Sequence, residues 1–184
     1  MKNILKNRWA LSTVVTTLII LVVSVLLAGV VTYFAINVTS TRVQEESLHL
    51  TKQHIWYAAN GTGYSAEAAL MIINTGGRDI VLDKVTVRGQ EVSWTNVFYN
   101  VTTASISNDL VFNTTLTDGG TISIGSSYIF EQASTDLTLE SGKTMVIYIA
   151  SPDSITVNDI GLTVALTVFT SQAMYYKEGN VESS

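Results

Sequence analysis

One uninterrupted apolar segment constrains this chain more than any other feature. From Ala10 to Ile36, over 27 residues, no side chain carries a charge. As a helix this segment is about 40 Å long, whereas the hydrocarbon core of a bilayer is about 30 Å thick. The apolar part of a removable secretory signal has only about 7–15 residues. The segment therefore predicts a helix that spans a membrane and stays with the protein.

Charges on either side of the segment predict its orientation. Lys2, Lys6 and Arg8 precede it without an acidic residue, and the other 7 basic and all 15 acidic residues follow it, so the net charge is +3 before the segment and −8 after it. Because basic residues in short flanks stay cytoplasmic, we expect the N-terminus inside the cell and the following domain outside. The acidic exterior without a basic run argues against nucleic acid as a partner.

The junction before the apolar segment has a recognisable pattern. Residues 6–17 read KNRWALSTVVTT. A short basic leader, a small residue at the junction and a long β-branched apolar helix resemble the precursors of archaeal type IV pilins, which carry class III signal peptides. The match A-L-S-x-V-V begins at Ala10, whereas Trp9, Thr13 and Thr16 depart from the family's pattern.

The resemblance implies how the chain is processed and with what it associates. A prepilin peptidase removes the basic leader, residues 1–10, at the junction that includes Arg8, Ala10 and Leu11. The favoured bond is Ala10–Leu11, and Trp9–Ala10 is the alternative. Assembly machinery then lifts subunits from the membrane into a homopolymer whose core is the helix 11–36. An uncleaved signal anchor is the competing interpretation.

Small residues follow one face of the apolar helix. At about 100° per residue, five of them fall within about 60° of one another: Thr13, Thr17, Ser24, Ala28 and Ala35. A helix that faces only lipid gains nothing from such a stripe. Helices that pack together gain close approach and hydroxyls that bond across the contact. The stripe therefore predicts a helix-packing surface.

The helix is predicted to continue as a stalk over residues 37–57. Between Gly29 and Gly61 there is no glycine or proline. Apolar residues recur every seven positions at Ile36, Val43, Leu50 and Tyr57, and many of the others are good helix formers. An ordinary juxtamembrane helix is the alternative to a rigid stalk.

Residues 58–178 show a period of two and predict an antiparallel β-sandwich ectodomain, so that the fold class is α+β. Turn signals separate the candidate strands, which are Leu70–Ile73, Ile80–Val87, Ile122–Ile124, Leu137–Leu139, Met145–Ala150 and Ile160–Val168. Both faces of Met145–Ala150 are apolar, as in a strand that is covered on both sides. The phase slips within Ile80–Val87, which predicts a bulge at Asp83–Lys84. Residues 179–184 are expected to form a tail.

No catalytic, cofactor-binding or metal-binding constellation is present in the sequence, and we expect no enzyme. There is no cysteine, and the serines of the domain have no histidine to activate them. The two histidines, His49 and His54, would lie about 140° apart on the expected stalk helix, so they would not share a metal.

Four N-x-[ST] sequons suggest decoration by N-linked glycans. They begin at Asn37, Asn60, Asn100 and Asn113. Asn37 abuts the membrane, so Asn60, Asn100 and Asn113 are the predicted acceptors.

Two functions from different classes follow. The first is a structural subunit of an archaeal type IV pilus-like filament at the cell surface that serves adhesion. The second is a binding module on a single-pass anchor, or a minor pilin, which does not polymerise and whose sandwich holds a sugar or another surface protein. Within the first, a swimming filament (archaellin) shares the same plan of leader, helix and β-domain.

Overall fold

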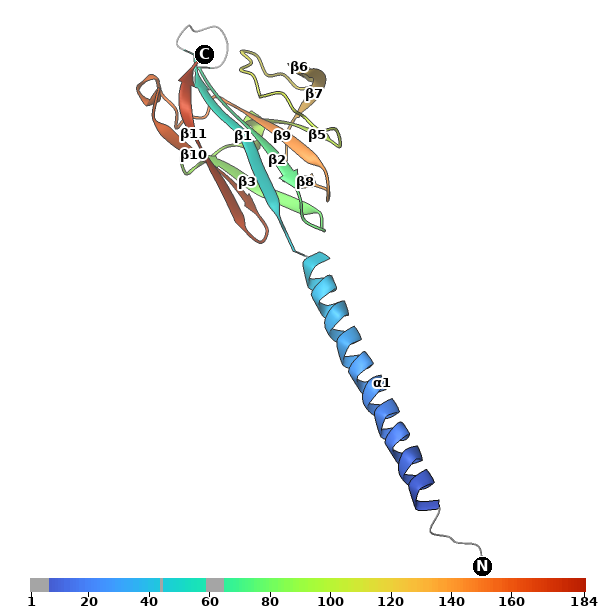
Figure 1. Ribbon diagram of the computed structural model, residues 1–184. Coiled ribbons are helices and arrows are strands. Elements are labelled where there is room, and N and C mark those ends of the chain that lie inside the picture. The colour runs from blue at the N-terminus through green and yellow to red at the C-terminus, as the bar shows by residue number, and fades with distance from the viewer. Residues whose placement is uncertain (1–6, 44, 59–64) are drawn as a thin grey trace, which may run out of the picture. The chain divides into compact units, whose positions relative to one another are not determined.

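The computed structural model describes residues 7–43, 45–58 and 65–184, and the chain divides into two units, the first of which ends at Val43. The first unit contains the helix α1 (Asn7–Val43), and the second contains the strands (Figure 1).

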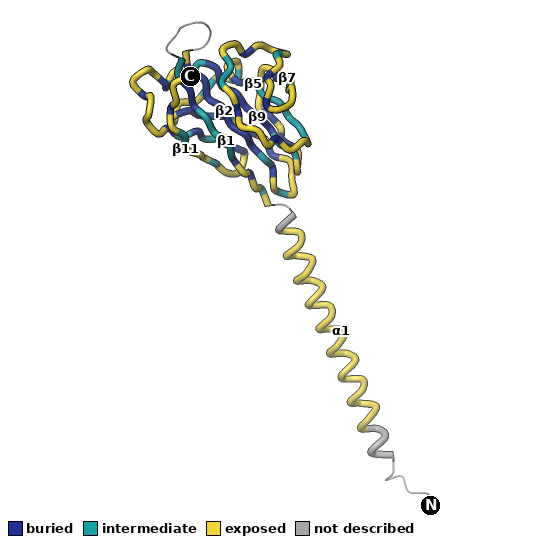
Figure 2. The backbone as a smooth tube through the Cα atoms, turned by 45° about the horizontal axis from the view of Figure 1, so that its top comes forward, coloured by how far each residue is buried: buried dark blue, intermediate teal, exposed yellow. Residues whose placement is uncertain are grey.

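Helix α1 is continuous over its whole length, as its run of apolar residues without proline predicts. It begins at Asn7, ahead of the expected start at Leu11, and ends at Val43. Every residue from Ser12 to Thr41 is exposed (Figure 2). Among the described residues, Ser12–Thr41 is the one helical segment that is long and apolar enough to cross a membrane.

The predicted helical stalk over residues 37–57 is wrong beyond Val43, because Leu48–Tyr57 forms the strand β1. A bulge lies in β1 between Thr51 and His54. The bulge changes which alternate residues face the core, so that Leu48 and Leu50 before it and Ile55 after it pack in the same cluster. Tyr57 packs there too. The spacing of seven from Leu50 to Tyr57 is therefore an interrupted period of two and not a helical repeat.

The remaining strands have the following bounds: β2 (Ala66–Asn74), β3 (Ile80–Val87), β4 (Gln90–Glu91), β5 (Val97–Thr102), β6 (Gly120–Ile124), β7 (Ser126–Gln132), β8 (Leu137–Leu139), β9 (Thr144–Ala150), β10 (Thr163–Thr170) and β11 (Met174–Ser183). Two short 3₁₀ helices, η2 (Trp94–Asn96) and η3 (Val157–Asp159), connect them. The predicted strand Ile160–Val168 begins only at Thr163, because η3 and a turn occupy the residues before it.

Within the described residues the strands form one mixed 11-stranded sheet, in the order β4-β3-β10-β11-β1-β2-β9-β5-β7-β6, with β8 paired to β3. The prediction of an antiparallel domain fails at one junction, where β1 and β11 run parallel, with Ile55 opposite Val181. The prediction that residues 179–184 form a tail is also wrong, because β11 extends to Ser183. The C-terminal strand therefore joins the two halves of the sheet.

The bulge predicted in the middle of β3 is confirmed. Phe169 of β10 pairs with Lys84, and the next residue, Thr170, pairs with Leu82, so Asp83 is the extra residue. This explains why Leu82 and Val85, on opposite parities of the strand, are both buried in the same core.

Two cores lie on opposite faces of the central strands β2 and β9, and Figure 2 shows both strands as buried. On one face, Leu70 and Ile147 pack with residues of β3 and β10. On the other face, Met71 and Tyr148 pack with residues of the β6–β7 hairpin and of the β5–β6 loop, residues 103–119. The prediction that Met145–Ala150 is covered on both sides is confirmed.

Candidate functional site

The surface of helix α1 is the first candidate site. Large apolar side chains are exposed along it, such as Leu21, Leu26 and Phe34, each more than 60% exposed. In a soluble protein such a surface would be buried or would mark an interaction site. The described side chains of this helix therefore require lipid or other protein around them.

The predicted small-residue stripe lies on this exposed helix. Thr17 Oγ1 donates a hydrogen bond to Val14 O (2.9 Å), and Ser24 Oγ donates to Ile20 O (2.7 Å). Because these hydroxyl donors are already satisfied within their own helix, lipid can surround them at low cost. The stripe also includes Thr13, Ala28 and Ala35. Its small side chains would let a neighbouring helix approach closely, whereas the hydroxyl donors of Thr17 and Ser24 are already used within α1.

The residues of the predicted leader junction, Arg8, Ala10 and Leu11, lie in helical backbone of α1. The first part of the leader lies outside the described residues. A peptidase that cleaves at Ala10–Leu11 would therefore have to open the first turns of the helix.

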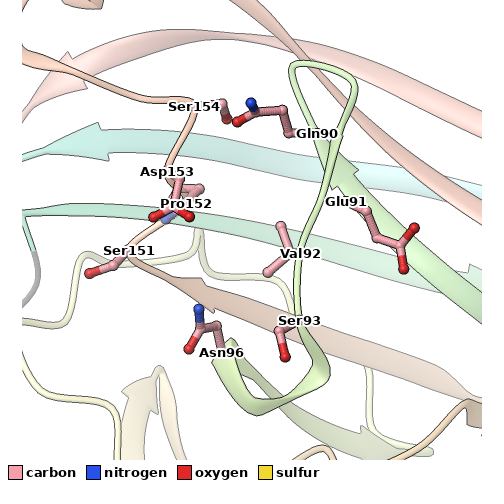
Figure 3. Close-up of a pocket in the computed structure, with 9 residues that line it drawn as sticks. All are labelled: Gln90, Glu91, Val92, Ser93, Asn96, Ser151, Pro152, Asp153 and Ser154. Carbon is pink, nitrogen blue, oxygen red and sulfur yellow. The ribbon is translucent and has the colours of Figure 1, made fainter.

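A polar pocket of about 450 Å³ is the second candidate site, and sequence analysis missed it. One wall comes from β4 and the segment that follows it, with Gln90, Glu91, Val92, Ser93 and Asn96. The other wall follows the end of β9, with Ser151, Pro152, Asp153 and Ser154. The two walls face each other in Figure 3. The sequence held weak signals of both turns, the only proline (Pro152) and the Arg88–Gly89 turn, but nothing that brought them together.

Hydrogen bonds join the β3–β4 turn to the segment after β9, and so hold the two walls of the pocket together. Ser154 Oγ donates to Val87 O (3.0 Å), and Arg88 Nη1 donates to Ser154 O (3.2 Å). The same guanidinium nitrogen pairs with Asp159 Oδ1 (2.7 Å). Hydrogen bonds from Thr156, and then from Arg88, hold the pKa of Asp159 below its usual value. The ionised Asp159 thus anchors Arg88, which ties the β3–β4 turn to the segment after β9.

The backbone leaves β9 in a sparsely populated conformation. Ser151 has φ +43°, which is unusual for a residue with a side chain. Its N–H donates to Ala66 O (2.8 Å), and Ile155 N donates to Pro152 O (3.1 Å), which closes the turn. Such backbone strain persists where surrounding contacts over-determine it. These two backbone hydrogen bonds therefore hold the second wall of the pocket in its strained conformation.

The carboxyl of Glu67 is buried on the face of the central strand β2 that points away from β3 and β10. Its side chain is fully buried, and its Oε1 accepts a hydrogen bond from Asn113 N (3.1 Å). Its Oε2 has no partner among the described residues. Burial raises the pKa of Glu67 to about 8, although the Asn113 bond acts against this. Glu67 is therefore protonated at neutral pH and secures the β5–β6 loop.

Further contacts fasten the β5–β6 loop to the sheet. Tyr148 Oη donates to Val111 O (3.0 Å), and Lys52 Nζ, at the β1 bulge, donates to Ile106 O (2.9 Å). His54 Nε2 lies 3.0 Å from Asp109 Oδ1. These contacts explain the bulge, which directs Lys52 toward the loop.

The histidines lie on β1 and not on a helix as expected. His49 is exposed, and His54 stacks on Trp56 with ring centroids 5.0 Å apart. Within the described residues, no group of three or more His, Cys, Asp and Glu gathers to hold a metal ion.

The three predicted glycan acceptors differ in their surroundings. Asn100 is partly buried in β5, and its Nδ2 donates to Ile129 O of β7 (2.7 Å), so a glycan there would break a bond between strands. Asn113 lies in the β5–β6 loop, where its Oδ1 accepts from Thr115 N (3.2 Å). Asn60 lies outside the described residues. Of the two described, Asn113 is the better acceptor.

No protein-family model matches the sequence, and no curated protein matches it. Among solved structures, the chain is similar to the ligand binding region of Serine-glutamate repeat protein A (SgrA) of Enterococcus faecium. That likeness has 12% identical residues and a TM-score of 0.32, and it covers 77% of this chain and 98% of the other. It does not place the chain in a family.

Proposed function

We propose that this chain is a structural subunit of a cell-surface filament like the archaeal type IV pili, and that it polymerises through helix α1. The observation that carries the proposal is the uniform exposure of an apolar helix joined to a separately packed β-domain. From Leu11 to Val43 the helix is about 50 Å long, clearly more than the roughly 30 Å core of a bilayer. A helix that bundles with its copies has a use for the extra length.

Packing drives the proposed assembly. Moving α1 from lipid into a bundle of identical helices changes its surroundings little in polarity, so close contact between helices must supply the energy. The small-residue stripe from Thr13 to Ala35 provides the surface for that contact. In the proposed filament, two parts of the sheet pack face to face around the core that contains Leu70 and Ile147, as in a β-sandwich. The β-domain then forms the outside of the filament. Adhesion is its task.

N-terminal sequencing of protein sheared from the cell surface tests the proposal. We expect polymeric material that begins at Leu11, or at Ala10 if the alternative bond is cut. A monomeric protein in the membrane that retains Met1 would exclude a filament subunit.

The polar pocket favours a second candidate, the anchored binding module that does not polymerise. In that case α1 only tethers the domain, and the pocket between β4 and the end of β9 does the work. The retained leader distinguishes this candidate from the filament subunit.

A further inference from the structure

We propose that the polar pocket between β4 and the segment after β9 binds a neutral carbohydrate. The proposal concerns the β-domain alone and stands whether or not helix α1 polymerises. The volume, about 450 Å³, lies within the range of small-ligand pockets, about 300–1,000 Å³.

The pocket offers unused hydrogen-bonding groups of both kinds. Within the described part of the chain, the side chains of Gln90, Asn96, Ser151 and Asp153 make no hydrogen bond or ion pair, and all four line the pocket. Amides both donate and accept, a hydroxyl does the same, and a carboxylate only accepts. A ligand that satisfies all of them must present donors and acceptors close together. Each hydroxyl of a sugar is both a hydrogen-bond donor and an acceptor.

The charge of the pocket excludes anionic ligands. Of the described residues that line it none is basic, and Glu91 and Asp153 are acidic. The nearby guanidinium of Arg88 is engaged with Asp159 and with the carbonyl of Ser154. A phosphate, sulfate or carboxylate would therefore meet like charge without a compensating cation.

A metal ion suits the pocket poorly. In Figure 3 the Gln90 amide extends toward Ser154, whereas the Glu91 carboxylate points away from the Ser151–Ser154 segment. This leaves Asp153 as the one carboxylate at the centre, and calcium requires about 6–8 oxygen ligands. The apolar lining, Val92 and Pro152, is enough for the C–H face of a sugar but too small for a lipid.

Preorganisation supports a binding role. The Arg88–Asp159–Ser154 contacts and the strained Ser151 fix both walls before a ligand arrives. Sites that need no ordering on binding lose less affinity to conformational entropy. An incidental surface hollow has no need for such support.

The test uses the full chain in detergent micelles, labelled with a fluorophore and applied to immobilised glycans with EDTA present. The array carries neutral glycans ending in glucose, galactose or mannose, together with sialylated and sulfated glycans. We expect binding to at least one neutral glycan and weaker or no binding to the anionic ones. Binding to no neutral glycan, or only to anionic ones, would overturn the proposal.

Variants locate the site. Titration with the bound oligosaccharide should show a loss of about tenfold or more for the double variant Asp153→Ala with Asn96→Ala, as roughly two hydrogen bonds are lost. Both residues are exposed, so the fold should persist. Asp136→Ala, at an exposed position near β8, is the matched control and should bind as the unaltered chain does. Equal affinity of the double variant would place the sugar elsewhere.

Asp153→Asn separates a sugar from a cation. It keeps an acceptor of the same shape and removes the charge, so sugar binding should fall by no more than a few fold. The carbohydrate assignment would be contradicted if the unaltered chain bound calcium or spermine but no glycan, and if Asp153→Asn abolished that cation binding.

Discussion

At the scale of single residues, Glu67 is a carboxyl that is fully buried in the β-domain. Its Oε1 accepts one hydrogen bond, from Asn113 N in the β5–β6 loop, and its Oε2 has no partner within the described part of the chain. Burial disfavours the charged form, which raises the pKa to about 8 from 4.5. The domain tolerates this residue because the neutral carboxyl still accepts the Asn113 N–H.

Stability of the β-domain should therefore fall as the pH rises from about 5 to about 8. In this window the folded state holds a proton on Glu67 that the unfolded state has released, so raising the pH favours unfolding. Each pKa unit of difference corresponds to about 1.4 kcal/mol. Below pH 4.5 both states are protonated, and the contribution is constant.

The variant Glu67→Gln should flatten this dependence and make the domain more stable than the unaltered one at pH 8. Gln keeps an oxygen for the Asn113 N–H and has no charge to desolvate. Unfolding free energies from denaturant titrations across this pH range, in detergent, provide the measurement. Glu178→Gln, at an exposed position on β11, is the control. An unchanged pH slope in Glu67→Gln would mean that the buried carboxyl is not responsible.

At the scale of elements, helix α1 and strand β11 each lead to a prediction about assembly or folding. The stripe on α1 is the surface proposed for helix packing. Strand β11 connects the β10 side of the sheet to β1, and its Val181 is only 1% exposed.

Replacing two stripe residues by larger ones, in Thr17→Leu with Ser24→Leu, should leave membrane insertion intact and abolish filament assembly. Leucine raises the apolar character of the helix but prevents close approach of a neighbour. Electron microscopy of sheared material and membrane fractionation measure the two properties. Thr16→Leu with Thr32→Leu is the matched control, because these residues lie outside the stripe and their hydroxyls also bond to their own helix. Normal filament yield from the stripe variant would refute the packing surface.

Val181→Ala should destabilise the β-domain by about 2 kcal/mol, the cost of lost burial plus a small cavity. Its backbone also bonds to Leu162 O and accepts from Gly161 N, so deletion of residues 179–184 should prevent folding altogether. Thermal melts followed by circular dichroism test both. Tyr176→Ala on the same strand, at a side chain 62% exposed, should have little effect. A deletion variant that melts normally would restore the interpretation of these residues as a tail.

At the scale of the whole molecule, the two units have different physical requirements. Both hydrophobic cores are built from residues between Leu48 and Val181, whereas the described side chains of α1 from Ser12 onward are exposed. The domain therefore contains what it needs to fold.

A protein of residues 45–184 should accordingly be soluble and monomeric, with the same melting temperature as the domain in the full chain. Light scattering and circular dichroism give the two quantities. Aggregation or loss of the β-sheet signal would show that the domain depends on the helix. The same protein should not form filaments under the proposed function, because it lacks α1.

Features that depend on local composition could be predicted from the amino-acid sequence alone. The 27 consecutive residues without a charge predict a helix long enough to span a membrane, because a backbone in lipid must satisfy its own hydrogen bonds, and α1 is helical over this whole segment. Strands with a clear period of two were predicted with correct or nearly correct positions, as was the bulge in β3, because burial of one face imposes that period.

Features that depend on partners far away in the chain could not be predicted without the three-dimensional fold. Residues 48–57 form a strand because β2 and β11 supply hydrogen bonds on both sides, and the β1 bulge concealed the period that would have revealed it. The last residues are a strand for the same reason. The polar pocket joins residues near 90 and near 150, and no local pattern encodes that proximity. In each case, contacts between segments far apart in the chain determine the structure, and the composition of one segment does not reveal those contacts.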